Sequence, residues 1–506
     1  MKKHLVSLFA LLLAAGPVSA AYILFPQGDS GLKADTKSAY DSYRAGDYAK
    51  ALAAFKAEAA RGDKDAQFAM GRLYEEGRAV APSLEEAEGW YRKAMKSGHT
   101  EAQFNLAVVL LRAPNRGKEG LEVLQQCAAS GNSRALLEMG TLYVTGNGVE
   151  KNTAKGKAML EQASAKGEAT AFETLGLMYE SGEGVEKSDA KAVENYENAA
   201  RKSNLKAMLR LAVKYSNGTG VPKDLAKAKE WLVKAADFNS TDAMLALGLM
   251  YETGNGVEKN PEEAVRWLTK AGEAGEANAL AKLGMMYAEG SGVAKDEKAA
   301  FSWSSKAAEK GSAAGMYALS TAYAKGAGVT ASPGESLKYL IAAATSNLPL
   351  AMRELAGRYR AGKEVAKDTI VAQSWYTRAT YAGDAESALT VVDMLLSGEG
   401  GLPPDAKTAK VILTKAAELG IAEAQLKLAE FHEKGLDGRP DLIRAYAVVL
   451  ATGDKFEPGL KKKAALEKLM TKEQIEQGKK EYDRIKAQPA AAPAGEGKKP
   501  DPAPVK

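Results

Sequence analysis

The chain has 506 residues, of which 26% are charged, 45% hydrophobic and 7% aromatic, a composition that suits a soluble folded protein. Lysine and arginine number 69 against 64 acidic residues, and this small excess excludes the basic footprint of a nucleic-acid-binding protein. The single cysteine, Cys127, excludes an internal disulfide.

The first 20 residues have the pattern of a secretory signal. Two lysines give a positive start, residues 5–15 form an apolar core, and Val18-Ser19-Ala20 is a small-residue cleavage site. A membrane anchor is the alternative, but the apolar run is shorter than the ~20 residues that a membrane helix needs. We therefore expect cleavage after Ala20, a linker over residues 21–35, no transmembrane segment in the mature chain, and a periplasmic or secreted location.

The next segments are expected to form paired helices. The stretch over residues 43–62, YRAGDYAKALAAFKAEAARG, resembles a tetratricopeptide repeat, and it predicts a tetratricopeptide-like helix pair over residues 36–65. From residue 66 the chain then repeats itself about every 36 residues, with a Leu-Gly-x-x-Tyr cluster and a Gly-x-Gly-Val turn in most units. A fixed period of this length indicates a solenoid, which we place at residues 66–454. The units open at Ala66, Ala102, Ala135, Ala171, Ala207, Ala243, Ala279, Gly315, Ala351, Ala388 and Ala424.

One unit shows how the pattern predicts two helices. In the unit that opens at Ala243, apolar residues at offsets 0, 4, 5 and 8 lie on one helical face. Gly254 and Gly256 then interrupt the helix, because glycine enters left-handed backbone conformations easily. Asn260 and Pro261 suit the N-cap and the first position of a second helix. Two such helices cannot bury their own apolar faces, so each unit must stack on its neighbours.

These motifs resemble the Sel-one-like repeat family, whose pattern is LGxMYxxGxGVxxDxxKAxxWxxKAAxxG. The resemblance covers about three quarters of the chain and implies an all-α fold: an α-solenoid, a right-handed superhelix of about eleven to twelve two-helix repeats. It also implies a scaffold for protein partners. Three departures are local: the Ala102 unit is three residues short, Ala79 and Glu364 replace the second turn glycine, and Leu396 and His432 replace the tyrosine. The match is nearly complete at Leu175, Gly176, Met178, Tyr179, Gly182, Gly184, Val185 and Asp189, and again at Leu283, Gly284, Met286, Tyr287, Gly290, Gly292, Val293, Asp296, Trp303, Lys306 and Ala307.

The C-terminal end is expected to close the array. Thr471 and Gln474 have the spacing of a capping box, which predicts a charged helix to about Lys486. Residues 455–487 therefore read as capping helices with a polar outer face. Residues 488–506 are rich in alanine, proline and lysine, a composition that predicts disorder.

The sequence shows no catalytic, cofactor-binding or metal-binding residues. Its three histidines lack metal-ligand spacing, the turn glycines lack the lysine of a phosphate loop, and no Gly-x-Ser-x-Gly motif occurs. We therefore expect no cofactor and no enzyme activity. Rows of tyrosines and tryptophans recur at fixed register, which favours a structural core over a ligand ladder.

A partner is expected to bind at first-helix positions that the core does not determine. Offsets 2 and 6 point away from the predicted core, yet they are apolar in the central units, which predicts a groove for a peptide or helix on the concave face. The alternative is that successive first helices pack closely and bury the same side chains. The candidate apolar residues are Leu177, Leu209, Val213, Leu245, Leu249, Met285 and Tyr317. The candidate flanking charges are Arg210, Lys282 and Arg353.

The functional prediction is a secreted or periplasmic repeat scaffold that binds a protein or peptide partner, with no nucleic acid involved. A protein that binds cell-envelope polysaccharide or peptidoglycan is the alternative, so an envelope component is a second candidate partner. A hydrolase acting on cell-wall-like compounds is disfavoured because it would require a titratable cluster on the concave face.

Overall fold

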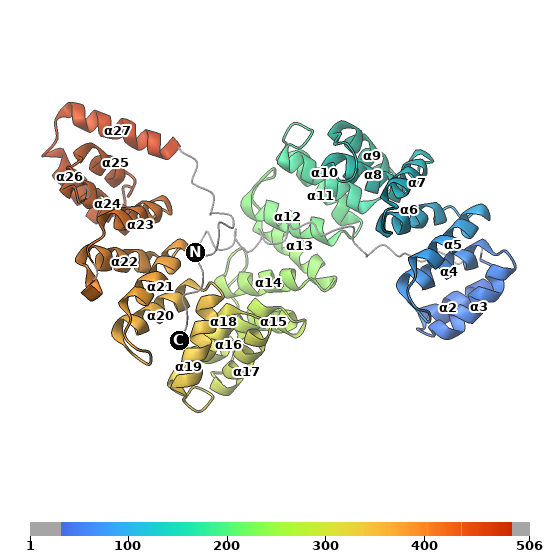
Figure 1. The fold of residues 1–506 in the computed structure, drawn as a ribbon, viewed down its shortest axis with the longest axis horizontal. Coiled ribbons are helices and arrows are strands. Elements are labelled where there is room, and N and C mark those ends of the chain that lie inside the picture. Colours follow the sequence, from blue (N-terminus) through green and yellow to red (C-terminus); the bar gives the residue numbers. More distant parts are fainter. Residues whose placement is uncertain (1–31, 402, 437, 488–506) are drawn as a thin grey trace. The chain divides into compact units, whose positions relative to one another are not determined.

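The computed structural model describes residues 32–487 except 402 and 437, and it consists of helices joined by short turns (Figure 1). No strand occurs among these residues, which confirms the predicted all-α solenoid of paired helices. The predicted signal, linker residues 21–31 and the predicted disordered tail lie outside the described residues, and α2 begins at Ala34, within the end of the predicted linker. The chain divides into two compact units, residues 1–222 and residues 223–506.

The first unit contains helices α2 to α12, which pack in consecutive pairs such as α4 with α5 and α10 with α11. Helices α2 and α3 occupy the segment expected to be tetratricopeptide-like, and α6 and α7 form the short repeat. The bounds are α2 (Ala34–Arg44), α3 (Tyr48–Ala60), α4 (Lys64–Glu76), α5 (Leu84–Lys96), α6 (Ala102–Arg112), α7 (Gly117–Ala129), α8 (Ser133–Thr145), α9 (Thr153–Ala165), α10 (Ala169–Ser181), α11 (Asp189–Arg201) and α12 (Leu205–Asn217).

The second unit contains helices α13 to α27, and its last helix, α27, packs against α25. The bounds are α13 (Leu225–Asp237), α14 (Thr241–Thr253), α15 (Pro261–Glu273), α16 (Ala277–Glu289), α17 (Glu297–Glu309), α18 (Ala313–Lys325), α19 (Pro333–Thr345), α20 (Pro349–Ala361), α21 (Thr369–Tyr381), α22 (Ala385–Ser397), α23 (Ala406–Glu418), α24 (Ala422–Lys434), α25 (Leu442–Leu450), α26 (Glu457–Glu467) and α27 (Lys472–Ala487).

The helices begin where the sequence places their caps. The Asn260 side chain accepts a hydrogen bond from the backbone N–H of Glu263 at 3.0 Å, and Pro261 is the first residue of α15. At α27 the predicted capping box forms in both directions. The Thr471 N–H donates to Gln474 Oε1 at 2.9 Å, and the Gln474 N–H donates to Thr471 Oγ1 at 3.3 Å.

The glycine of the Leu-Gly cluster lets the two helices of a repeat approach closely. A Cβ atom at Gly176 would lie 2.5 Å from the ring of Tyr196, and one at Gly284 would lie 2.4 Å from Ser304 Oγ. Such distances are too short for two non-bonded atoms, so any side chain here would force the pair apart.

The second glycine of the Gly-x-Gly-Val turn, which we call the tip glycine, contacts the preceding repeat. A Cβ at Gly292 would lie 2.3 Å from the carbonyl oxygen of Pro261, and one at Gly328 would lie 2.1 Å from that of Glu297. Both contacts are with the first residue of a second helix. Ala79 and Glu364, which replace the tip glycine, still adopt left-handed φ angles of 57° and 63°. The same contact recurs as Gly184 with Thr153, Gly220 with Asp189, Gly256 with Leu225 and Gly400 with Thr369.

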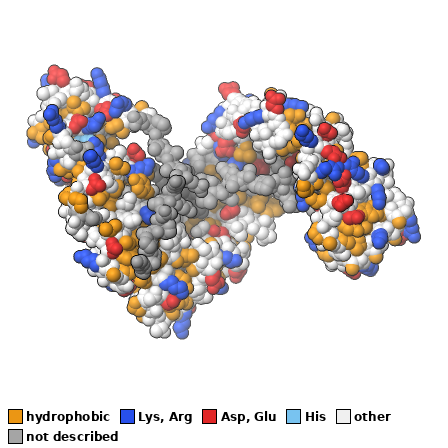
Figure 2. Space-filling model, in the orientation of Figure 1, with side chains coloured by type: hydrophobic (Ala, Val, Ile, Leu, Met, Phe, Trp, Pro, Cys, Tyr) orange, Lys and Arg blue, Asp and Glu red, His pale blue; other side chains and the backbone are white. Residues whose placement is uncertain are grey.

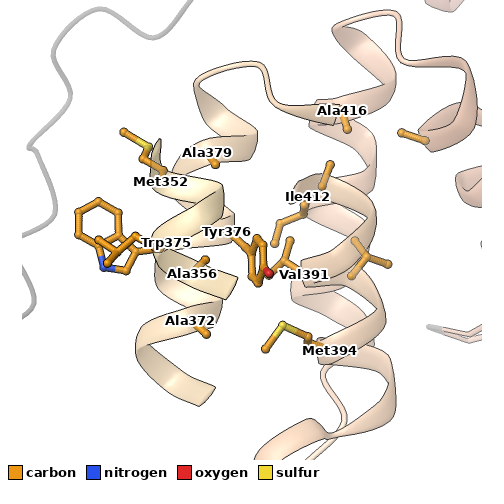
Figure 3. Close-up of a cluster of buried hydrophobic side chains, with 14 of the residues drawn as sticks. Met352, Ala356, Ala372, Trp375, Tyr376, Ala379, Val391, Met394, Ile412 and Ala416 are labelled. Carbon is orange, nitrogen blue, oxygen red and sulfur yellow. The ribbon is translucent and has the colours of Figure 1, made fainter. Parts of the chain in front are cut away.

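Side chains from neighbouring repeats share one core. Figure 3 shows Ala356 of α20, Tyr376 of α21, Val391 of α22 and Ile412 of α23 in one buried cluster, with Tyr376 pointing toward Val391. Val391 and Ala356 are fully buried and Tyr376 is 7% exposed. Because these four residues come from two repeats, neither helix pair would bury its apolar face alone.

Candidate interaction surface

The predicted apolar residues lie on first helices of both units, and their exposure differs. We call this set, with Met285 as its most exposed member, the first-helix strip. Leu209 and Leu245 are buried, at 9% and 4% exposure, whereas Met285 is 44% exposed. The remaining members, Leu177, Val213, Leu249 and Tyr317, are partly exposed. Leu177, Leu209 and Val213 belong to the first unit, and Leu245, Leu249, Met285 and Tyr317 belong to the second.

Offset 2 is more buried than offset 6 because it packs within the repeat stack. Leu137 at offset 2 of its repeat is 5% exposed and belongs to a core cluster with residues of α10. Tyr317, at the same offset, packs against the core cluster that extends from α19 to α24. Offset 6 carries Leu249 and Met285, so the accessible part of the strip in the second unit centres on these two side chains.

In the first unit, a charged network surrounds the strip. Arg210 lies 3.5 Å from Glu180 and 4.0 Å from Glu173 of α10. The buried Lys214 lies 2.8 Å from Glu180 and 2.7 Å from Asp189. Burial raises the pKa of Glu180, but the hydrogen bonds that Lys214 and Tyr196 donate to it outweigh burial and hold that pKa below its usual value. These cations are therefore neutralised by carboxylates of the neighbouring repeat.

In the second unit, the candidate cations are also paired across repeats. Lys282 of α16 lies 2.7 Å from Glu252 of α14. Arg353 of α20 pairs with Asp384 at 3.5 Å and also with Glu386.

Tyr317 belongs to the same set of contacts between neighbouring repeats. It donates a hydrogen bond to Glu354 at 2.8 Å, and burial together with this bond raises the pKa of Tyr317 to about 12. Figure 2 shows charges of both signs interspersed with hydrophobic side chains on the visible faces. A surface with paired charges offers apolar contacts without a net electrostatic preference.

The position of two cations in the repeat indicates that their side chains are buried. Lys214 and Arg358 occupy the position at which other repeats carry methionine, as at Met178, Met250 and Met286. Both side chains are at most 9% exposed and contact carboxylates, Arg358 at 2.9 Å from Glu354. A charged residue at a core position of the repeat predicts a buried ion pair, but its partners depend on how the neighbouring helix is placed.

Lysine side chains cover one ring face of three tryptophans on second helices. Lys234, Lys270 and Lys306 place their ammonium groups 4.2 to 4.4 Å from the ring centroids of Trp231, Trp267 and Trp303. This arrangement recurs because each lysine follows its tryptophan by three residues, on the same helical face. The partly exposed indoles are therefore occupied by cations of the chain itself.

The cysteine and the histidine that could take part in catalysis, Cys127 and His99, lie in separate buried environments. Cys127 is buried, and burial raises the pKa of its thiol to about 11. His99 stacks on Phe68 with 4.1 Å between ring centroids, and burial lowers its pKa to about 4. Across the described part of the chain, no group of three or more His, Cys, Asp or Glu residues is placed to hold a metal ion.

None of the described helices combines the length and apolar character that crossing a membrane requires.

Comparison with known proteins decides the family. The Sel1 repeat matches ten segments that cover about two thirds of the chain, and six of these segments are 36 residues long. The chain belongs to the Sel1 repeat family. Proteins built from Sel1 repeats are generally scaffolds for protein–protein interaction, and the fold is typically non-catalytic. The matched segments are 64–99, 133–168, 175–204, 205–237, 241–276, 277–312, 313–348, 349–384, 393–421 and 422–447.

The solved structures that are similar to this Sel1 repeat chain include two with TM-scores above 0.5. The first is a protective antigen present in uropathogenic Escherichia coli strains, described as displaying an SLR fold. It is 26% identical with a TM-score of 0.56, and the match covers 88% of this chain and 99% of the antigen. The second is a Sel1 repeat protein from Oxalobacter formigenes, 31% identical with a TM-score of 0.54, covering 64% of this chain and 93% of that protein. A search of curated proteins finds no match.

Proposed function

We propose that this Sel1 repeat chain is a secreted or periplasmic scaffold that binds an apolar segment of a protein partner at Leu249 and Met285, the accessible members of the first-helix strip in the second unit. The observation that carries the proposal is the exposure of Met285, 44%, at the offset where Leu249 of the preceding repeat is also partly exposed. Neighbouring repeats thus present apolar side chains at equivalent positions. A helix or extended segment with spaced apolar residues fits such a surface.

The paired charges support an apolar rather than an anionic partner segment. Lys282 flanks Met285 in sequence but is already held by Glu252 at 2.7 Å. A partner carboxylate would have to displace that contact, whereas an apolar side chain would not. Burial of Met285 and Leu249 by a partner would supply the favourable free energy.

Site-specific photocrosslinking in the producing cell tests the proposal. A photoreactive amino acid at Met285 should capture a protein partner, and the same amino acid at Ile370 is the control. Ile370 is 64% exposed on α21, so it matches Met285 in accessibility but lies on a second helix. Equal capture at the two positions, or no capture at Met285, would contradict the proposal.

Substitutions provide a second readout. With the photoreactive amino acid kept at Met285, Leu249→Asp should sharply reduce capture while circular dichroism remains native, because the Leu249 side chain is not fully buried. The burial of Leu209 makes Leu209→Asp unsuitable for this purpose, since a buried carboxylate would destabilise the fold itself. Ile370→Asp serves as the matched control and should leave capture unchanged.

The proposed location has its own test. The signal pattern over residues 1–20 predicts that the mature protein begins at Ala21. Mass spectrometry of the N-terminal peptide from purified protein, together with cell fractionation, should show that start and an envelope or extracellular fraction. An intact Met1 in a cytoplasmic fraction would contradict the proposed location while leaving the binding surface untouched.

A further inference from the structure

Two hollows lie in the second unit, beside the turns that join first to second helices. The Tyr251 hollow, of about 550 Å³, is lined by Tyr251, Lys229 of α13 and the turn over residues 256–260. The Tyr287 hollow, of about 920 Å³, is lined by Tyr287, residues 293–298 and Gly328. Tyr251 and Tyr287 are 36 residues apart, so the repeat supplies the tyrosine and the turn of both hollows, while the remaining walls differ.

Backbone contacts shape the walls of the hollows before any ligand arrives. The Asn260 N–H donates to the Tyr251 carbonyl at 2.8 Å, and the Asp296 N–H donates to the Tyr287 carbonyl at 2.9 Å. These bonds fold each turn back onto the end of its first helix. The tip glycine Gly328 then rests against the start of α17 on the far side of the Tyr287 hollow. A binding site with preformed walls loses little conformational freedom when it is occupied.

The charges that line each hollow balance. The Tyr251 hollow contains Lys229 and Lys259 against Glu230 and Glu258. The Tyr287 hollow contains two lysines and two acidic residues within residues 295–298. Zero net charge gives neither anions nor cations an advantage, while ammonium and carboxylate groups supply both donors and acceptors.

Tyrosine rings form the apolar part of each hollow. Tyr251 and Tyr287 are partly exposed, and the Lys229 ammonium lies 5.4 Å from the centroid of the Tyr251 ring. One repeat further on, Tyr323 stacks on Tyr339 with 5.8 Å between centroids and contacts Phe301 edge-on at 5.5 Å. An aromatic face packs against the C–H groups on one face of a sugar ring, and surrounding donors and acceptors bind the hydroxyls of that ring.

We propose that the Tyr251 and Tyr287 hollows bind a linear uncharged oligosaccharide. Balanced charge, aromatic rings and mixed hydrogen-bonding rims fit a polyhydroxylated ligand. Two tyrosine-lined hollows in successive repeats fit a polymer of repeating units. This site lies beside the turns, not on the first-helix strip, so the inference does not depend on the proposed protein partner.

Isothermal titration of the full-length mature chain tests the inference with four hexasaccharide probes. Cellohexaose and chitohexaose are neutral, hexagalacturonate is anionic, and the chitosan hexamer is cationic. At least one neutral probe should bind, and more tightly than either charged probe and than its own disaccharide. Failure of both neutral probes to bind, or equal or tighter binding of a charged probe, would overturn the inference.

Variants locate the site. Tyr251→Ala with Tyr287→Ala should weaken binding of the neutral hexasaccharide about tenfold or more, since two aromatic floors are lost. Tyr287→Phe keeps the ring and should bind like the native chain. If circular dichroism shows that the double variant is unfolded, Lys298→Ala decides the matter: this exposed rim residue should weaken binding severalfold. Native-like affinity in the folded double variant, or in Lys298→Ala, would refute the site.

Discussion

The tip glycine Gly328 offers a direct test of how adjacent repeats are held in register. Its φ angle is +71°, and a Cβ atom would lie 2.1 Å from the Glu297 carbonyl oxygen and 2.9 Å from the Lys298 nitrogen. Gly328→Ala therefore incurs about 1 kcal/mol for the left-handed conformation and about 2 kcal/mol for displacing the contacting backbone. We expect the free energy of unfolding to fall by about 3 kcal/mol.

Gly311→Ala is the matched control for this substitution. Gly311 also has a left-handed φ, +82°, but no heavy atom lies within 4 Å of the added Cβ position. It should lose only about 1 kcal/mol, so the difference between the variants measures the contact between repeats. Urea titration followed by circular dichroism gives both values, and hydrogen exchange at the start of α17 locates the effect. Equal losses in the two variants would refute the steric account of the tip glycine.

Three further substitutions test other parts of the structure. His99 has a pKa near 4 when folded and 6.5 ordinarily, so the unfolded chain binds the extra proton and stability should fall by up to roughly 3 kcal/mol as pH drops from 6.5 to 4. The raised pKa of Asp65, 3.6 Å away, acts in the opposite sense at the acid end, and His99→Gln should flatten the dependence of urea midpoints on pH. Ser203→Gly should raise stability by about 1 kcal/mol in thermal melts because Ser203 has a φ of +63°, and a lower melting temperature would contradict this. Tyr196→Phe removes a 2.6 Å hydrogen bond to Glu180 and should cost about 1–2 kcal/mol in urea titration, whereas an unchanged midpoint would show that the bond contributes nothing.

Local sequence chemistry was sufficient to predict the elements of this fold. Asn260 and Pro261 begin a helix because an amide side chain and a fixed φ favour that start in any context. Thr471 and Gln474 cap α27 for the same kind of reason. Ser203 adopts the left-handed conformation that glycine or asparagine takes at this turn in other repeats, so the repeat pattern outweighs the preference of the individual residue.

The exposure of the strip was harder to predict because it depends on neighbouring repeats. An ideal helix places offsets 2 and 6 on the same outward side, yet Leu245 is buried and Met285 is exposed. The closeness of the next first helix decides this difference, and no single repeat contains that information. The ion-pair partners of Lys214 could not be predicted from the sequence either, because Asp189 lies 25 residues away and is brought near only by the stacking of repeats.

The contact of each tip glycine with the preceding repeat determines which insertions and deletions the fold tolerates in evolution. Because Gly292 meets Pro261 in the same way that Gly328 meets Glu297, duplication or loss of one whole 36-residue block recreates the same junction. Recombination that removes half a block would not. The repeat that contains Glu364 is an exception, because a duplicated copy of it would carry a strained turn in place of the tip glycine. The solenoid can thus gain or lose whole repeats while the contacts between neighbouring repeats stay the same.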